Sequence, residues 1–500
     1  MVFSSVIFVW VFLPIVLIAY YAVAALFRKA SDRGQRAKNM VLLISSLAFY
    51  GMGGYKYLLL LFGVLLVNYF GGLAVNRETV KRKRLTALAV TVVMNLMALF
   101  FFKYLNLFVR IYDNVKYAAS GNGTLSDCLR NMLQLKSTGQ LAFVDIVLPI
   151  GISFYIFQSI SYVVDVYRKD AGVQRNFFDF SLYVSFFPQL IAGPIVKYSD
   201  VDAAIRGRKE TLALFGEGVS RFIYGMAKKV LIANTVAVIA DEIWKINPDS
   251  LGASVTWLAA VCYTLQIYFD FSGYSDMAIG LGKMFGFEFR ENFNYPYISG
   301  SVQEFWRRWH ISLSTWFREY VYIPLGGSRC SRAKLLRNIF IVFLLTGVWH
   351  GANFTFLCWG LLYAVLLMAE RMFLGKILSR KWIKPLAHIY TLLVVIIGWV
   401  LFRSEDIIYA GKFISKMFMR GNGEYTVFSF INVRSMIAII AGIVLSLPVY
   451  RSIRAKSEKL SDRAKGILGA VESVWLIVLL AYSMIVIVSG SYNPFIYFQF

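Results

Sequence analysis

The chain has 500 residues, of which 58% are hydrophobic, 17% are aromatic and only 16% are charged. This composition excludes an ordinary soluble protein, and apolar runs long enough to cross a membrane recur from one end of the chain to the other. Lysine and arginine give a net charge of +24, but they cluster in short loops between apolar runs, which is typical of cytoplasmic loops and argues against a nucleic-acid partner.

The apolar runs predict helices that cross or enter the membrane. In chain order they are Val6–Phe27, Met40–Tyr50, Tyr57–Ala74, Leu85–Phe102, Val147–Val166, Phe177–Val196, Val230–Ile239, Trp257–Phe271, Ile339–Val348, Phe354–Met368, His388–Leu401, Met436–Leu447 and Val474–Val488. They predict an all-α polytopic membrane protein with about ten to twelve transmembrane or re-entrant helices. We expect residues 1–500 to form one membrane domain, with its motifs between about 147 and 375.

The positions of the basic loops predict an orientation. Basic clusters at residues 28–38 and 77–84 favour a cytoplasmic location for both loops. The first run lacks a basic leader and a small-residue cleavage site, so we interpret it as a retained span. Residues 111–143 are polar and predict an external loop, with room for a short helix. This arrangement places both termini on the extracytoplasmic side of the cell membrane.

Several segments depart from a simple span. Two prolines and a glycine interrupt Phe177–Val196, which predicts short or re-entrant helices packed inside the protein. Residues 203–230 are basic and amphipathic and predict a cytoplasmic or interfacial helix. The polar stretch Asp270–Asp276 predicts a helix break, and the aromatic and charged residues 287–334 predict another cytoplasmic or interfacial region.

His350 lies inside an apolar run and is one of only three histidines. An ionisable side chain is costly in hydrocarbon, and imidazole is well suited to take a proton near neutral pH, so His350 is a candidate catalytic base. The 13 residues from Arg337 to His350 correspond to about 20 Å of helix, which leaves the imidazole inside a hydrocarbon core about 30 Å thick. Gly347 and Gly351 permit a helix break or a close helix contact beside it.

His310 lies in a second unusual segment, in which three tryptophans alternate with arginines. At helical spacing Trp306 and His310 share a face, as do Glu304 and Arg308. The pattern favours an interfacial anchor whose rings lie at headgroup depth, with His310 merely satisfied by hydrogen bonds. A functional role for His310 is the alternative.

Other chemistries receive little support. The four cysteines are far apart and predict unpaired thiols, no cluster has metal-ligand spacing, and the glycines near residue 282 do not form a dinucleotide fingerprint. His388 lies beside Lys384 at a predicted interface, and we expect no catalytic role for it.

Long motifs resemble the membrane-bound O-acyltransferases. They are WRRWHISLSTWFREYVYIPLGG (Trp306–Gly327), LTGVWHGANFTFLCWG (Leu345–Gly360) and FFPQLIAGPI (Phe186–Ile195). The resemblance is to the bacterial branch that includes alginate O-acetyltransferases and D-alanyl transfer proteins, and it covers essentially the whole chain. YFDFSGYSDMAIGLGKMFG (Tyr268–Gly286), NFNYPYIS (Asn292–Ser299) and YNPFIYFQF (Tyr492–Phe500) favour the alginate side.

The resemblance implies roles for individual residues. It implies that His350 is catalytic and that His310 is a second functional position in the same transmembrane tunnel. The candidates for substrate binding are Asn353, Asp270, Ser272, Tyr274, Asp276, Trp306, Arg307 and Trp349. Asn353 either orients substrate or the ring, or is an ordinary packing amide. The cluster 270–276 either lines a donor entrance or pairs with the arginines of 307–318.

The expected reaction is O-acetylation of an extracytoplasmic polysaccharide. The resemblance implies a cytoplasmic acyl thioester as donor, with acetyl-CoA the foremost candidate, no bound cofactor, and a GDSL/SGNH-type partner protein outside the cell in addition to membrane lipid. His350 would act as base, and an acyl-histidine intermediate stays open as an alternative. D-alanyl transfer to teichoic acid, with a carrier protein as donor, is the runner-up within the family, and a small-solute transporter is the alternative from another class.

Overall fold

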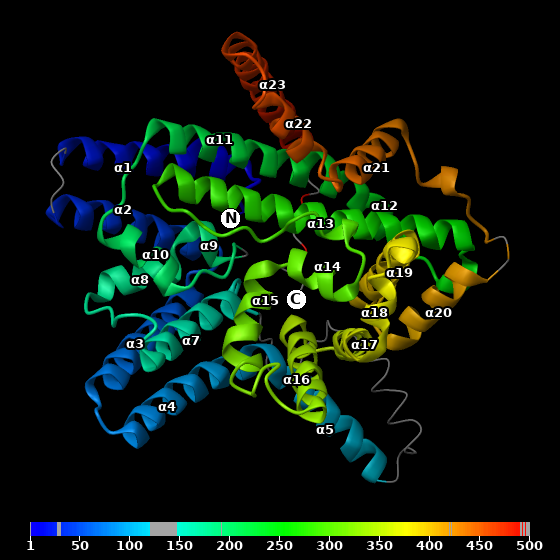
Figure 1. The fold of residues 1–500 in the computed structure, drawn as a ribbon, viewed down its shortest axis with the longest axis horizontal. Coiled ribbons are helices and arrows are strands. Elements are labelled where there is room, and N and C mark those ends of the chain that lie inside the picture. The colour runs from blue at the N-terminus through cyan, green and yellow to red at the C-terminus, as the bar shows by residue number, and fades with distance from the viewer. Residues whose placement is uncertain are drawn as a thin grey trace.

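The computed structural model describes residues 2–27, 32–120, 148–191, 193–419, 421, 423–490, 493 and 496, apart from the side chains of residues 110, 114 and 117–119. Within these ranges all of the extended regular structure is helical and no strand occurs (Figure 1). This agrees with the predicted all-α class. The described part of the predicted external loop is helical as far as Ala119, and the remainder of that prediction, from 121 to 143, lies outside the described residues.

The α-helices, in chain order, are α1 (Leu13–Leu26), α2 (Asp32–Gly51), α3 (Lys56–Arg77), α4 (Lys81–Leu99), α5 (Leu105–Ala119), α7 (Ile152–Arg168), α8 (Phe177–Ser185), α9 (Phe187–Leu190), α10 (Tyr198–Arg206), α11 (Leu212–Ala227), α12 (Asn234–Trp244), α13 (Ala253–Met284), α14 (Val302–Arg308), α15 (Ile311–Phe317), α16 (Arg332–His350), α17 (Phe354–Ala369), α18 (Gly375–Leu378), α19 (Lys384–Arg403), α20 (Ile407–Phe418), α21 (Val433–Leu445), α22 (Val449–Ser457) and α23 (Asp462–Ser489). Several are extended by π-helical segments, which include η2 (Phe100–Tyr104), η3 (Lys228–Ala233) and η7 (Glu370–Leu374).

Eight helical runs in the described residues are long and apolar enough to cross a membrane, and a ninth is added if α21 and α22, bent by 62°, count as one span. The protein is therefore a multi-pass membrane protein. Shorter helices fill the space between the spans. Among them, α8 and α9 confirm the short helices predicted for Phe177–Val196, and the break between them lies at Phe186, two residues before the first of its prolines.

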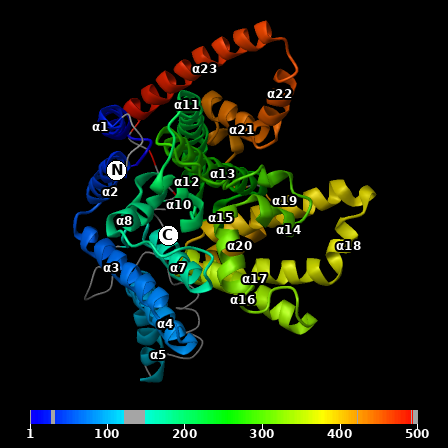
Figure 2. The same ribbon diagram turned by 60° about the vertical axis from the view of Figure 1, so that its left-hand side comes forward.

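The centre of the molecule is α13, a 32-residue helix that is buried along nearly all of its length. It lies antiparallel to α11, and the two helices run side by side in both views (Figures 1 and 2). Glycines face glycines at two levels, because a Cβ on Gly218 would lie 2.6 Å from the carbonyl oxygen of Gly280 and one on Gly225 would lie 2.6 Å from that of Gly273. Small residues at these positions let the two backbones approach closely, which is how helices in membranes commonly associate.

One prediction for this region is wrong. The stretch Asp270–Asp276 does not break a helix, since α13 runs through it without interruption. The predicted cytoplasmic or interfacial helix is part of a longer helical run, because α11, η3 and α12 together cover Leu212–Trp244, and an 18-residue apolar stretch of that run is 78% buried. Charges on one helix are neutralised by charges on the other, so the polar stretch of α13 can be buried.

Three ion pairs provide this neutralisation. The carboxylate of Asp276 lies 2.8 Å from Arg221 and 2.6 Å from Lys228, and Asp270 lies 2.6 Å from Lys229. The last pair is almost fully buried, with 2% of each side chain exposed. A pair of opposite charges with further hydrogen bonds is tolerated where an isolated charge is not.

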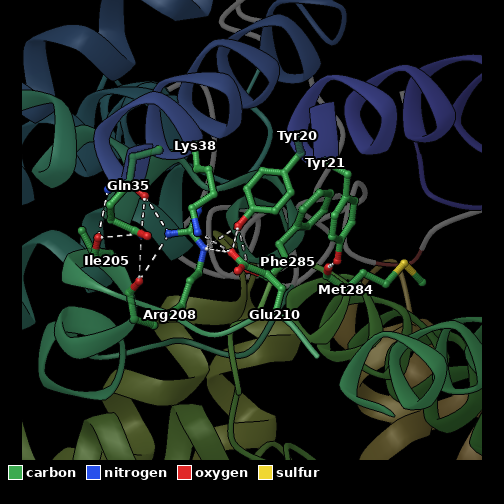
Figure 3. A network of polar contacts seen from close by, with 11 residues as sticks. Tyr20, Tyr21, Gln35, Lys38, Ile205, Arg208, Glu210, Met284 and Phe285 are labelled. Carbon is green, nitrogen blue, oxygen red and sulfur yellow. Dashed lines mark hydrogen bonds and ion pairs between the residues drawn. The ribbon is translucent and has the colours of Figure 1, made fainter. Parts of the chain in front are cut away.

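A polar network joins the N-terminal helices to this centre (Figure 3). Arg208, between α10 and α11, donates from Nε to the Tyr20 hydroxyl over 2.7 Å, and Lys38 donates to Glu210 over 2.8 Å. The Tyr21 hydroxyl donates to the carbonyl oxygen of Met284 at the end of α13. Burial raises the pKa of Glu210, but hydrogen bonds from Lys38 and Tyr20 outweigh it and leave that pKa below its usual value. Helix α1 is thus fastened to the end of α13, and α2 to the segment between α10 and α11.

The periphery is more loosely attached. Figure 2 shows α22 and α23 extending away from the centre, and α23 exposes large apolar side chains such as Ile467, Val474 and Trp475. Apolar side chains on the outside of a membrane helix face lipid, whereas those in the centre face other helices.

The glycine contacts between α11 and α13 make a direct prediction. Gly218→Ala places a methyl group against the backbone of α13 and should destabilise the protein by about 1–3 kcal/mol, seen as a lower midpoint of thermal denaturation in detergent. Gly216→Ala, on the same helix with nothing within 4 Å of a new Cβ, should leave the midpoint unchanged or raise it, because alanine favours a helix by about 1 kcal/mol over glycine. Equal midpoints for the two variants would contradict the proposed contact.

Candidate functional site

A close helical hairpin holds His350 at the end of α16. A Cβ on Gly347 would lie 2.5 Å from the carbonyl oxygen of Phe356, and one on Gly360 would lie 2.5 Å from that of Phe343. Helices α16 and α17 therefore touch through backbone at the level of the histidine. The predicted apolar pair and the close helix contact at Gly347 are both confirmed.

Asn353 closes the turn between the two helices. Its side-chain oxygen accepts from the Thr355 amide at the start of α17, and its Nδ2 donates to the carbonyl oxygen of Glu405 over 2.7 Å. These bonds use the amide for a helix N-cap and for a link to the loop after α19. In this conformation its geometry is that of a structural residue next to His350.

His310 lies at the junction of α14 and α15 and has a left-handed backbone, with φ of 44°. Its Nδ1 lies 3.2 Å from Oδ1 of Asn292, which also accepts from the backbone amide of Ser312 over 3.1 Å and from its hydroxyl over 2.9 Å. Because that amide identifies the Asn292 atom as an oxygen, His310 donates from Nδ1, and Nε2 is the nitrogen with the lone pair. Burial lowers the pKa of His310 to about 3, so its ring is neutral.

The predicted interfacial anchor is wrong. Helix α14 ends at Arg308, so Trp306 and His310 do not share a helical face. The three tryptophans of the segment, Trp306, Trp309 and Trp316, are 8%, 3% and 7% exposed and pack inside the protein. The predicted pairing of Glu304 with Arg308 is confirmed at 2.8 Å.

Trp349 brings the two histidines together. Its ring centroid lies 4.8 Å from that of His350 and 6.2 Å from that of His310. Trp359 and Phe402 pack edge-on against His350 at 5.0 and 5.1 Å. The aromatic rings shield the imidazoles from bulk water, which strengthens electrostatic interactions inside the site.

A small cavity opens beside His350. It measures about 40 Å³ and is lined by His350 and Trp349, by Lys103 of η2, by Ile191 and by residues 148–154 at the start of α7. The sequence did not identify Lys103 as a candidate site residue, because the predicted span ends at Phe102. A lone cation within a long apolar run was the signal that could have identified it.

The structure separates other candidates from this cavity. Asp270 pairs with Lys229 and accepts the Ile496 amide over 2.9 Å. Asp276 pairs with Arg221 and Lys228, so neither carboxylate pairs with the arginines of 307–318 among the described contacts. Tyr274 stacks on Phe3 at 4.5 Å.

Among the remaining candidates for substrate binding, three do not line the cavity and one does. Ser272 is buried in α13, Arg307 is exposed on α14, and Trp306 packs on Trp359 one layer behind His350. Trp349 is the candidate for substrate binding that lines the cavity together with His350.

A buried carboxylate positions the segment that carries His310. Glu370 of η7 accepts from the backbone amides of Val302 and Gln303 over 2.7 and 2.9 Å at the first turn of α14. A carboxylate there satisfies amides that a helix N-terminus leaves without partners. His388 contacts the carbonyl oxygen of Ser299 through Nδ1 at 3.2 Å. No group of three or more histidine, cysteine, aspartate or glutamate side chains that could hold a metal ion occurs in the described part of the chain.

Comparisons with known proteins agree on one family. A family model described as the membrane-bound O-acyltransferase (MBOAT) family matches residues 42–406. The chain is 40% identical to the protein named Probable alginate O-acetylase AlgI from Pseudomonas putida, over 100% of both chains. It is 32% identical to a peptidoglycan O-acetyltransferase from Helicobacter pylori over 83% of this chain and 80% of that one, and 28% identical to a teichoic acid D-alanyltransferase from Bacillus subtilis over 53% and 69%.

The buried pair of Lys229 and Asp270 predicts a non-additive pair of substitutions. Asp270→Asn leaves a buried ammonium without its counter-ion and should cost about 3–5 kcal/mol. Adding Lys229→Met removes that charge, so the double variant should be more stable than Asp270→Asn alone, measured by thermal denaturation in detergent. If Asp270 instead bound substrate, the double variant would recover stability without recovering acyl-transfer activity.

Proposed function

Because the chain belongs to the membrane-bound O-acyltransferase family, we propose that it transfers an acetyl group from a cytoplasmic thioester to a hydroxyl group of an extracytoplasmic polysaccharide, with His350 as the catalytic base. The protein is an O-acyltransferase on the strength of that family, which sets the transporter alternative aside. The observation that carries the finer assignment is the placement of His350 beside His310, against Trp349 and next to a cavity.

The chemistry requires a base at this point. Acyl transfer from a thioester forms a bond between the acceptor oxygen and the acyl carbon and breaks the bond between that carbon and sulfur. His350 would accept the hydroxyl proton as the oxygen attacks, and would return it to the departing thiolate. Such proton transfer typically contributes ~10²–10⁴-fold to a rate.

His310 would support this step. Its neutral ring presents Nε2 while Nδ1 is held by Asn292. A neutral imidazole can accept a hydrogen bond from a substrate hydroxyl, so His310 would orient the acceptor rather than carry charge. A covalent acyl-histidine needs no group beyond those present, and it stays the alternative for His350.

We infer the class of acceptor from the relatives that align with most of this chain. The relatives that align with at least four fifths of this chain are named for alginate or peptidoglycan O-acetylation. The D-alanyltransferase of Bacillus subtilis aligns with 53% of the chain. We therefore propose an acetylated polysaccharide or peptidoglycan, reached through a GDSL/SGNH-type partner, and retain D-alanyl transfer as the second candidate.

The donor and the orientation belong to the same proposal. The basic loops support a cytoplasmic location for the start of α16, and His350 lies 13 residues beyond Arg337 on that helix. Both termini would then lie on the extracytoplasmic side of the cell membrane. A cytoplasmic donor with phosphates, such as acetyl-CoA, would meet the basic surface of residues 283–337 on its way in.

Substitution of the histidines tests the assignment. His350→Ala should lower acetyl transfer to the polymer by at least about 10²-fold while leaving the amount of folded protein unchanged, measured by polymer-bound acetate and size-exclusion chromatography. His388→Asn is the matched control and should retain activity, because the side-chain amide of asparagine can donate to the Ser299 carbonyl from nearly the position of Nδ1. Full acetylation by His350→Ala would contradict the proposed base.

The donor is tested separately with radiolabelled acetyl-CoA added to inverted membrane vesicles. Label should pass to the polymer or to the partner protein in wild-type vesicles and should be lost with His350→Ala, because the thioester enters from the exposed cytoplasmic face. Vesicles that acetylate polymer from their own contents but take no label from acetyl-CoA would show that the donor is a carrier-bound acyl group instead.

A further inference from the structure

The π-helical segment η2 reaches the end of α16 with two adjacent side chains. Lys103 donates to the carbonyl oxygen of Trp349, and the Tyr104 hydroxyl donates to that of Val348 over 2.8 Å. The last carbonyls of a helix have no partner within the helix, so both residues act as caps for the helix that ends at His350.

A cap alone does not account for a lysine at this position. Tyr104 satisfies the neighbouring carbonyl with a neutral donor, whereas a cation within a membrane span is costly. Among the described carboxylates, none forms an ion pair with Lys103, whose Nζ lies 5.6 Å from the centroid of the Trp349 ring. When Lys103 is protonated, its charge faces a carbonyl oxygen and an aromatic ring, both of which attract a cation without neutralising it.

The position of this charge relative to His350 is specific. Lys103 and His350 line the same cavity of about 40 Å³, together with Trp349. Protonated Lys103 has three protons on Nζ, and the Trp349 carbonyl accepts one of them. The other two remain for a group that enters the cavity beside the imidazole.

We propose that Lys103 is a further catalytic residue that stabilises the oxyanion formed during acyl transfer. The inference rests on the proposed function. As the acceptor oxygen attacks the acyl carbon and its proton passes to His350, the carbonyl electron pair moves onto oxygen, and the Lys103 ammonium donates a hydrogen bond to that oxyanion. The pair then returns, the carbon–sulfur bond breaks, and the thiolate takes the proton from His350, so that the ammonium keeps its own protons throughout.

Lys103→Met tests this role, because methionine keeps the unbranched length and removes the charge. Its kcat should fall by about 10²–10³-fold, as when one oxyanion donor is removed elsewhere, with the KM for acetyl-CoA changed by less than about threefold, since the interaction forms only in the transition state. Lys103→Arg keeps a cationic donor, so its kcat should be at least about tenfold higher than that of Lys103→Met.

Tyr104→Phe is the control for helix capping. It removes the hydrogen bond to the adjacent carbonyl of α16 but no charge, and its kcat should stay within about threefold of wild type. If Lys103 were only a cap, Lys103→Met and Tyr104→Phe would lower activity and thermal stability alike, and Lys103→Arg would not differ from Lys103→Met in kcat. Either result would overturn the proposal, as would a change confined to KM.

Folding and the proposed function are controlled in the same assay. If Lys103→Met does not yield folded protein, Lys103→Gln and Lys103→Arg are compared at equal folded amounts, and equal kcat values for these two would overturn the proposal. If His350→Ala abolishes activity and Lys103→Met leaves it intact, the role of Lys103 is refuted and the proposed function is not. Acetyl transfer that is unaffected by His350→Ala refutes the proposed function, and with it the oxyanion role that rests on it.

Discussion

The architecture depends on the neutralisation of charge between α11, η3 and α13 in a medium that does not solvate charge. Three cations on one helical run face two carboxylates on the other, and glycines between them bring the backbones into contact. Without the ion pairs, α13 could not be buried along its 32 residues, because an isolated charge in a low-dielectric interior costs several kcal/mol. The surrounding helices, α1 and α2 included, are attached to this buried pair.

Helix ends inside the protein create the second requirement. A helix that stops at membrane depth leaves backbone groups without water, and each must find a partner in the protein. Glu370 supplies it for α14, Asn353 for α17, and Lys103 with Tyr104 for α16. The ends of α16 and α17 adjoin His350, and α14 leads into His310.

The local environment then assigns different tasks to two histidines of the same intrinsic chemistry. Asn292 holds one ring nitrogen of His310 and fixes its tautomer, while aromatic edges surround His350 next to a cavity and a lysine. A base and a lysine that line the same small space suit a reaction in which a proton leaves one atom while negative charge develops on another. Trp349 connects the parts, since it contacts both histidines and its carbonyl holds Lys103.

The sequence by itself determined the helical membrane class, the main spans, the broken segment at α8 and α9, the hairpin that carries His350, and the family. These follow from local hydropathy, from the positions of glycine and proline, and from long motifs, each of which can be recognised within a single segment of the sequence. It also singled out His350, because a histidine between apolar runs is unusual without reference to any partner.

Only the tertiary structure decided which polar residues share a site. The sequence suggested a substrate-binding helix break at Asp270 and Asp276, but α11 and η3 supply cations that pair with both. It also suggested an interfacial location for the tryptophans near His310, but the rest of the protein covers them. Lys103 lies 247 residues before His350 in the chain, and nothing local shows that the two line one cavity. The physical reason is that burial, charge pairing and the orphaned ends of helices are set by contacts between distant segments.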